Sequence, residues 1–316
     1  MSKTTLPHQT DHLFITDGGL ETTLIFLKGL DLPGFAAFDL LKTEESCETL
    51  KEYYRCYLDI AVQYNSGFIL ESPTWRSNPD WIEKLGFAET DLAVFNTKAI
   101  QLMVELKEAY QSKIPNLVIS GCIGPRGDGY VSALEMQPHA AQDYHAKQIQ
   151  IFKQSGADVV SAFTMNYVAE AIGVARAAEA AETPVVISFT VERDGKLQTG
   201  TSLKKAIQQV DASVATAPIY YMVNCAHPSH FMQELQNGKG EPWLQRIKGV
   251  RANASCKSHQ ELDESTELDR GKLKELGDAY EQLKKNFKQL NVFGGCCGTD
   301  DEHVREMVSH LQIAAY

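Results

Sequence analysis

Two adjacent cysteines, Cys296 and Cys297, lie in a run that also contains glycines at positions 294, 295 and 298. Neighbouring thiols cannot point the same way from a regular strand or helix, whereas a glycine-rich turn lets both sulfurs converge on one ion. Cys225 ends an apolar run rich in β-forming residues and is the best candidate for a third thiolate. The pattern predicts a three-sulfur zinc site with one tetrahedral position open.

Such a site favours one kind of chemistry. Three thiolates give a Zn²⁺ site excess negative charge, which keeps an added substrate thiolate nucleophilic at neutral pH, so alkyl transfer to sulfur is expected. Two alternatives remain. Buried cysteines can act only as small hydrophobic side chains, as isolated residues such as Cys47 commonly do. His227 could also supply a fourth protein ligand and make the zinc structural, although Pro228 disfavours this by holding His227 extended.

Short apolar runs alternate with segments of helical periodicity along the chain. The strands are expected to end near Asp17, Glu71, Cys122, Thr164, Val191, Cys225, Asn253 and Cys296. The helices are expected near residues 50–61, 92–106, 138–155, 167–180, 201–211, 228–237, 268–287 and 300–313. Eight such units without a linker predict a single (β/α)8 TIM barrel, one domain over residues 1–316, with its active site at the carboxyl ends of the strands.

Local signals refine this pattern. Thr299 followed by Glu302 predicts a capping box at the start of the last helix. Two long connections, residues 20–42 and 255–270, interrupt the alternation of strands and helices. The second contains an acidic cluster and is either a solvated surface loop or a lid over the active site.

Composition limits the classes of partner and compartment. The chain has 43% hydrophobic and 22% charged residues, as an ordinary globular protein does. A net charge of -11 argues against a nucleic-acid partner and favours small-molecule substrates. We find no signal peptide and no membrane-spanning run, so we expect a cytoplasmic protein with reduced cysteines. The oligomeric state cannot be inferred.

Three motifs resemble the homocysteine S-methyltransferase family, and the resemblance extends over nearly the whole chain. They are Asp17-Gly18-Gly19-Leu20-Glu21-Thr22, Asn224-Cys225 and Gly294-Gly295-Cys296-Cys297-Gly298-Thr299. The resemblance implies that the three cysteines hold zinc and that the zinc holds the thiolate of homocysteine. It also implies that Asp17, with the backbone of Gly18, fixes the amino-acid part of the substrate. Thr164 and Asn224, at two further strand ends, are expected to contact substrate as well.

One position departs from the family pattern. Family members commonly have Glu before Thr at the fourth strand end, where the glutamate contacts the amino group of the substrate, whereas this chain has Phe163. Either Asp17 or another acid such as Glu71 compensates, or the acceptor is a different thiol. Each acid also has a structural alternative: Asp17 could simply form a turn, and Glu71 could pair with Arg76 or another cation.

The sequence therefore predicts a zinc-dependent thiol S-methyltransferase, with methyl transfer to homocysteine by in-line displacement as the main hypothesis. The donor is expected to be a sulfonium or quaternary ammonium compound, because its positive charge makes the methyl group transferable. Such a charge is attracted to aromatic faces, and Trp75, Trp81 and Tyr130 are candidates to provide them. The alternatives are a zinc hydrolase, a non-enzymatic zinc- or thiol-binding barrel, and a methyltransferase with a different thiol acceptor.

Overall fold

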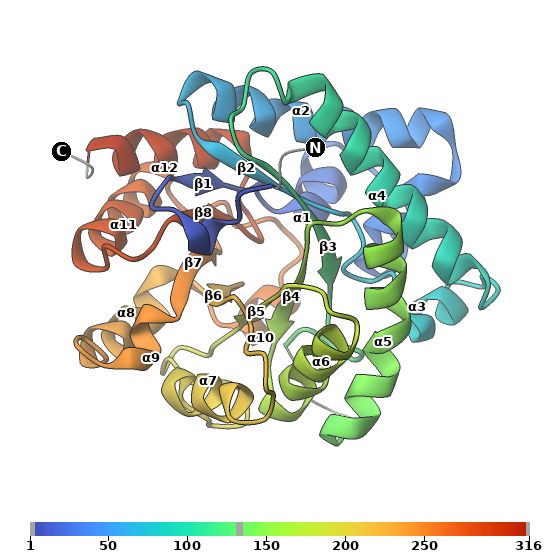
Figure 1. Ribbon diagram of the computed structural model, residues 1–316. Helices are drawn as coiled ribbons and strands as arrows, with labels where there is room; N and C mark the ends of the chain where they lie inside the picture. Colours follow the sequence, from blue (N-terminus) through green and yellow to red (C-terminus); the bar gives the residue numbers. More distant parts are fainter. Residues whose placement is uncertain (1–3, 131–134, 314–316) are drawn as a thin grey trace.

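A closed barrel of parallel strands forms the centre of the molecule, with the strands in sequence order around it (Figure 1). The computed structural model describes residues 4–130 and 135–313. The strands are β1 (Phe14–Ile15), β2 (Gly67–Glu71), β3 (Leu117–Ile123), β4 (Val159–Met165), β5 (Val185–Phe189), β6 (Tyr220–Asn224), β7 (Ile247–Ala252) and β8 (Val292–Gly295). The barrel closes where β1 pairs with β8, with Phe14 opposite Val292. These findings confirm the predicted (β/α)8 barrel.

Helices surround the barrel on the outside (Figure 1). The longer ones are α2 (Glu44–Gln63), α4 (Asp91–Tyr110), α5 (Pro138–Ser155), α6 (Val168–Ala180), α7 (Leu203–Asp211), α8 (Pro228–Asn237), α11 (Leu273–Asn286) and α12 (Asp301–Ile313). The shorter ones are α1 (Leu20–Thr22), α3 (Pro79–Lys84), α9 (Pro242–Gln245), α10 (His259–Asp263), η1 (Pro7–Gln9), η2 (Thr23–Leu27), η3 (Pro33–Phe35) and η4 (Ala37–Lys42). No helix within the described ranges is both long enough and apolar enough to span a membrane.

Along the strands, side chains alternate between two environments, with shifts in register in β4 and near the start of β7. In β2, Phe68 and Leu70 pack outward against the helices, while Ile69 belongs to a second apolar cluster, the one inside the barrel. Since side chains alternate along a strand, Glu71 also points inward. The same rule turns Phe163 of β4 and Arg251 of β7 inward, because their neighbours Ala162 and Val250 pack outward. The inner cluster is thus followed, toward the carboxyl ends of the strands, by a layer that carries polar and charged side chains.

The start of α12 differs from the predicted capping box. The hydroxyl of Thr299 donates instead to the carbonyl of Cys296 at 2.7 Å, which closes the turn that carries the cysteines. Asp300 takes the capping role, since its Oδ1 accepts from the backbone N–H of His303 at 3.3 Å. Glu302 pairs with Arg270. The prediction was wrong by one residue because the turn itself uses the Thr299 side chain.

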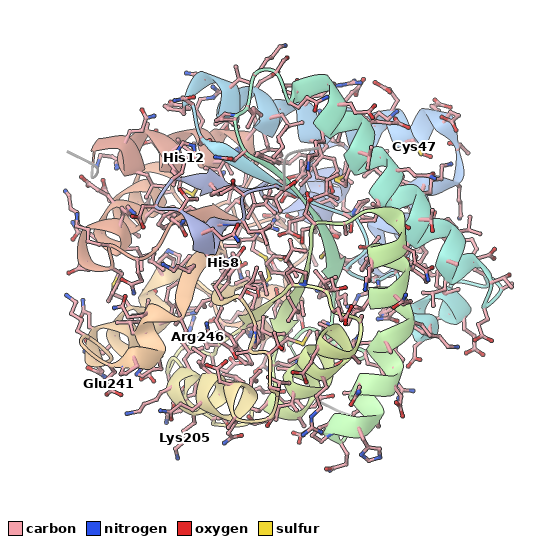
Figure 2. All side chains as sticks on the ribbon, in the orientation of Figure 1. His8, His12, Cys47, Lys205, Glu241 and Arg246 are labelled. Carbon is pink, nitrogen blue, oxygen red and sulfur yellow. A yellow bond between two sulfur atoms is a disulfide. The ribbon has the colours of Figure 1, made fainter. Side chains whose placement is uncertain are left out.

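Both long connections lie at the carboxyl end of the barrel. Residues 20–42 form α1, η2, η3 and η4 in succession, and the segment after β7 contains α10. Side chains from both connections line one cavity that also contains the cysteines. Figure 2 views the opposite end, where His8 and Arg246 precede β1 and β7; Cys47, also labelled there, lies on α2 at the periphery.

Candidate metal and substrate site

Three cysteines from two strand ends meet at the mouth of the barrel. The sulfur atoms of Cys225, Cys296 and Cys297 all lie within 4.8 Å of one another. Cys225 directly follows β6, and the other two follow β8. In this structure Cys225 and Cys296 are joined by a disulfide, while Cys297 is a free thiol. The fold therefore brings together the residues that the sequence singled out, although 71 positions separate Cys225 from Cys296.

Glycines shape the turn that carries the cysteine pair. Gly298 has a φ of +81°, in the left-handed region, and a Cβ at this position would lie 2.5 Å from the carbonyl oxygen of Asp269. A Cβ at Gly19 would likewise lie 2.5 Å from the carbonyl oxygen of Cys296. Only glycine fits such close backbone approaches. The loops after β1 and β7 thus press directly on the cysteine turn.

The backbone of Cys225 is held by residues that the sequence analysis missed. Cys225 has a φ of 52°, unusual for a residue with a side chain. Its carbonyl oxygen accepts from His259 Nε2 at 2.8 Å and from Asn253 Nδ2 at 3.0 Å. These bonds come from the loop after β7, and they hold Cys225 in this strained conformation at the end of β6. The capping box of Ser258 and Glu261 is a sequence signal for the start of α10, but it does not indicate that His259 contacts Cys225.

Asn224 and Thr164 bind each other at the ends of β6 and β4. Asn224 Oδ1 accepts from the backbone N–H of Thr164 at 2.9 Å and from the Ser188 hydroxyl at 2.6 Å. Asn224 Nδ2 donates to the Thr164 hydroxyl at 3.0 Å. Thr164 has a φ of 61°, which is costly for a β-branched residue, and this network holds it in place. Both residues line the cavity.

The cavity beside the cysteines has a volume of about 330 Å³. Its wall includes Phe163, Trp75 and Tyr130 among its aromatic side chains. The Tyr130 hydroxyl lies 3.5 Å from Cys297 Sγ, and its ring stacks on His259 with centroids 4.1 Å apart. The cavity is large enough for a small substrate, and the metal-ligating candidates form part of its wall.

Two of the aromatic rings predicted to meet a cationic donor, Trp75 and Trp81, lie against a cationic side chain of the protein itself. The guanidinium of Arg76 lies 4.2 Å from the ring centroids of both Trp75 and Trp81. Arg76 also forms an ion pair with Asp128 at 3.6 Å, so Glu71 is not its partner. Of the three aromatic residues proposed to meet a cationic donor, Trp75 and Tyr130 line the cavity.

Asp17 has both carboxylate oxygens engaged. Arg251 Nη2 donates to Oδ1 at 2.7 Å, and the Tyr53 hydroxyl donates to Oδ2 at 3.0 Å. Arg251 is itself held by the carbonyl oxygens of Gly295 and Gly18, each at 3.0 Å. The sequence analysis missed Arg251, although a charged residue at an inward position of β7 was a usable signal. Desolvation by burial raises the pKa of Asp17, and the charge of Arg251 opposes that shift.

Glu71 is in a different situation. Its side chain is buried, and its Oε2 has no hydrogen-bond partner among the described residues. Burial raises the pKa of Glu71 to about 7, while the positive charge of Arg251 acts in the opposite direction. A buried carboxylate oxygen without a donor is costly, so Oε2 is available to a hydrogen-bond donor that enters the cavity.

The donor set fits a soft divalent metal. Three cysteine sulfurs in one cluster are typical ligands for zinc, provided that the Cys225–Cys296 pair is reduced. Burial raises the pKa of the Cys297 thiol, so a bare thiolate there needs a compensating positive charge. His227 is not among the clustered candidate ligands. Its Nδ1 accepts instead from the backbone N–H of Ser229 and caps α8. The candidate ligand set in the described part of the chain therefore consists of the three cysteines.

Comparisons with solved structures agree with this fold. The metallated form of the homocysteine methyltransferase MmuM from Escherichia coli has a TM-score of 0.73 and 20% sequence identity, covering 95% of this chain and 96% of that chain. The oxidized form has a TM-score of 0.73 and 19% identity, covering 96% of this chain and 99% of that chain. At this identity the likeness establishes the fold. A comparison with curated protein sequences finds no significant match.

A family model settles the classification of the chain. The model described as homocysteine S-methyltransferase matches residues 14–311, a range that includes every strand of the barrel and all three clustered cysteines. Enzymes of this family transfer a methyl group to the sulfur of homocysteine. The chain is therefore an enzyme of this type and belongs to the homocysteine S-methyltransferase family.

Proposed function

We propose that this chain is a zinc-dependent S-methyltransferase that moves a methyl group from a sulfonium or quaternary ammonium donor to homocysteine, giving methionine. The observation that carries the proposal is the convergence of Cys225, Cys296 and Cys297 in the wall of a cavity suited to a small substrate. The family assignment supports the acceptor, and the sulfur-only donor set supports zinc.

Cys225, Cys296 and Cys297 would hold the zinc ion once the first two are reduced. When bound, zinc lowers the pKa of a thiol placed in its open position, so that the sulfur is a nucleophile at neutral pH.

Residues of the chain position the three cysteines and exclude water from the cavity. His259 and Asn253 fix the backbone of Cys225, and the glycine turn after β8 fixes the other two cysteines. Phe163 and Trp75 give the cavity apolar walls. Alignment of the donor methyl with the acceptor sulfur in a dry cavity is the main contribution that such a scaffold makes to an in-line displacement. No covalent bond between enzyme and substrate is needed.

The charge of the cavity favours a cationic donor. Side chains of Asp263 and Glu267, from the loop after β7, line the cavity, and the chain as a whole has a net charge of -11. A negative potential at the mouth raises the local concentration of a sulfonium or quaternary ammonium compound. The ring of Tyr130, beside Cys297, offers an apolar surface to the methyl group.

The proposed site also has a consequence for the cellular compartment. A site that needs three reduced thiols belongs in a reducing compartment, so we propose that the chain acts in the cytoplasm as a single barrel domain in methionine formation.

Turnover by the reduced, zinc-supplied protein tests the proposal. Homocysteine is incubated with S-methylmethionine, S-adenosylmethionine or a betaine, and methionine is measured by mass spectrometry. We expect methionine from at least one donor and none from the Cys296→Ser variant. Absence of methionine with all three donors, from protein that contains zinc, would contradict the proposal.

A second candidate is methyl transfer to a different thiol. The observation that favours it is Phe163, whose ring lies 5.0 Å from the guanidinium of Arg251 and provides no carboxylate for an amino group. A panel of thiols without an amino group separates the two candidates, because this second function requires such a thiol to react faster than homocysteine.

A further inference from the structure

Two buried side chains with opposite charges face the same cavity without bonding to each other. Glu71 and Arg251 both line it, and each affects the pKa of the other through its charge. No hydrogen bond joins them in the part of the chain that the structure describes. Both charged groups are therefore available, from one cavity wall, to a ligand that carries the two opposite charges.

Each side chain has one group directed at no described partner. On Glu71 this group is Oε2, which is fully buried. On Arg251, Nε and Nη2 donate to Gly295, Asp17 and Gly18, and Nη1 has no hydrogen-bond acceptor among the described residues. A buried carboxylate and a guanidinium with a remaining donor are the complements of an ammonium and a carboxylate.

Among the neighbouring side chains, Glu71 is the best candidate to accept an ammonium group. Each carboxylate oxygen of Asp17 already accepts a hydrogen bond, one from Arg251 and one from Tyr53. Phe163 points into the barrel beside Arg251, where a carboxylate would have formed an ion pair with the guanidinium. Of these acidic and aromatic neighbours, Glu71 alone offers a buried acceptor atom without a donor.

We propose that Glu71 accepts the ammonium of the acceptor amino acid and that Arg251 Nη1 donates to its α-carboxylate, so that Glu71 determines specificity for an α-amino thiol. This inference rests on the proposed function and names the part of the site that selects the acceptor. Asp17 then acts as a positioning residue, because it orients Arg251. The strand ends that carry Glu71 and Arg251 belong to the same barrel mouth as the cysteine turn, so one small molecule can reach all three.

The test compares three thiols in the wild type and in Glu71→Gln. They are homocysteine, its desamino analogue 4-sulfanylbutanoate, and its decarboxy analogue 3-aminopropane-1-thiol. The wild type should prefer homocysteine to both analogues. In Glu71→Gln we expect kcat/KM for homocysteine to fall about 100-fold, because an ammonium loses its buried partner. With the desamino analogue kcat/KM should change little, since that compound has no ammonium to lose. An equal fall for both thiols, or no fall for homocysteine, would overturn the inference.

A matched control is Glu21→Gln, since Glu21 lines the same cavity and burial also raises its pKa to about 7. This variant should leave the preference for homocysteine over the desamino analogue unchanged. If Glu21→Gln removes the preference and Glu71→Gln does not, the assignment to Glu71 is wrong.

Binding of the product gives a readout that needs no methyl donor. Calorimetric titration with L-methionine and with its desamino analogue 4-(methylsulfanyl)butanoate should show that Glu71→Gln weakens only the first. If the wild type makes no methionine, the proposed function fails, and the titration still decides the role of Glu71. If it makes methionine and binds both products equally, the inference fails while the function stands.

Discussion

At the scale of single residues, Asp17 and Glu71, two buried acids of the cavity wall, differ in their partners. Asp17 is bound to Arg251 and Tyr53. Glu71 keeps one oxygen, Oε2, without a donor among residues 4–130 and 135–313. The sequence analysis selected both acids as substrate contacts, because the ion pair between Arg251 and Asp17 cannot be inferred from the sequence. The roles of Asp17, Gly18, Thr164 and Asn224 toward substrate remain predictions.

The raised pKa of Glu71 gives a prediction for stability against pH. Its pKa is about 7 in the folded protein and 4.5 in its unperturbed form, so between these values the folded state binds more protons than the unfolded state. Ionisation of Glu71 therefore reduces stability as pH rises through this window. Gln lacks this cost, so Glu71→Gln should be more stable than the wild type at pH 8, by on the order of 2–3 kcal/mol, and should gain much less at pH 5.

Urea unfolding of both proteins at the two pH values measures this difference. Glu21→Gln should give the same sign, because burial likewise raises the pKa of Glu21 to about 7. A stability difference that is equal at pH 5 and pH 8 would mean that Glu71 is not desolvated as described. A larger gain in stability at pH 8 than at pH 5, together with the loss of acceptor preference, would show that Glu71 is kept for function at a cost in stability.

At the scale of elements, the strand ends and their turns decide the geometry of the site. The period of apolar residues predicted each strand end within about two residues, because inward and outward positions of a buried barrel strand both require apolar residues and the run stops at the active-site loop. The predicted bounds of α5 and α8 match the structure, and Pro at the first turn of each explains their starts.

The sequence predicted the loops less well. The residue that caps α12 is Asp300, one position after the predicted Thr299. The short helices of the long connections gave no periodic signal in the sequence. His259 illustrates why: its bond to the carbonyl of Cys225 depends on how a loop folds back over the barrel, and local sequence does not encode this. The loop at 255–270 does line the cavity through Leu262 and Asp263, so its placement fits a lid, which remains a prediction.

The cysteine turn provides a prediction at this scale. Gly298→Ala places a Cβ in the left-handed region and against the carbonyl of Asp269, so it should displace Cys297 and lower both stability and zinc content. Gly200→Ala is the matched control, because Gly200 has a φ of +76° with nothing within 4 Å of a Cβ. The control should cost about 1–2 kcal/mol from its backbone conformation alone and leave zinc content unchanged.

Urea unfolding and metal analysis of the two variants measure these effects side by side. Equal zinc content in Gly298→Ala and Gly200→Ala would show that the close approach of the β7 loop does not position the cysteines.

At the scale of the whole molecule, barrel closure brings distant chemistry together. Parallel strands in sequence order place every strand end on one face, so cysteines 71 positions apart become neighbours. The sequence could predict this much, because the position of each candidate at a strand end implies a shared face. It could not predict the Arg251–Asp17 pair, which depends on side-chain contacts across the barrel interior.

The central claim is that Cys225, Cys296 and Cys297 together bind one zinc ion with a position open to a thiol. Zinc K-edge X-ray absorption of the fully reduced protein tests it most directly. We predict one zinc per chain with three sulfur neighbours at about 2.3 Å, a fourth sulfur after homocysteine is added, and loss of zinc in Cys296→Ser. Zinc without sulfur neighbours, or a reduced protein that binds no zinc, would contradict the account.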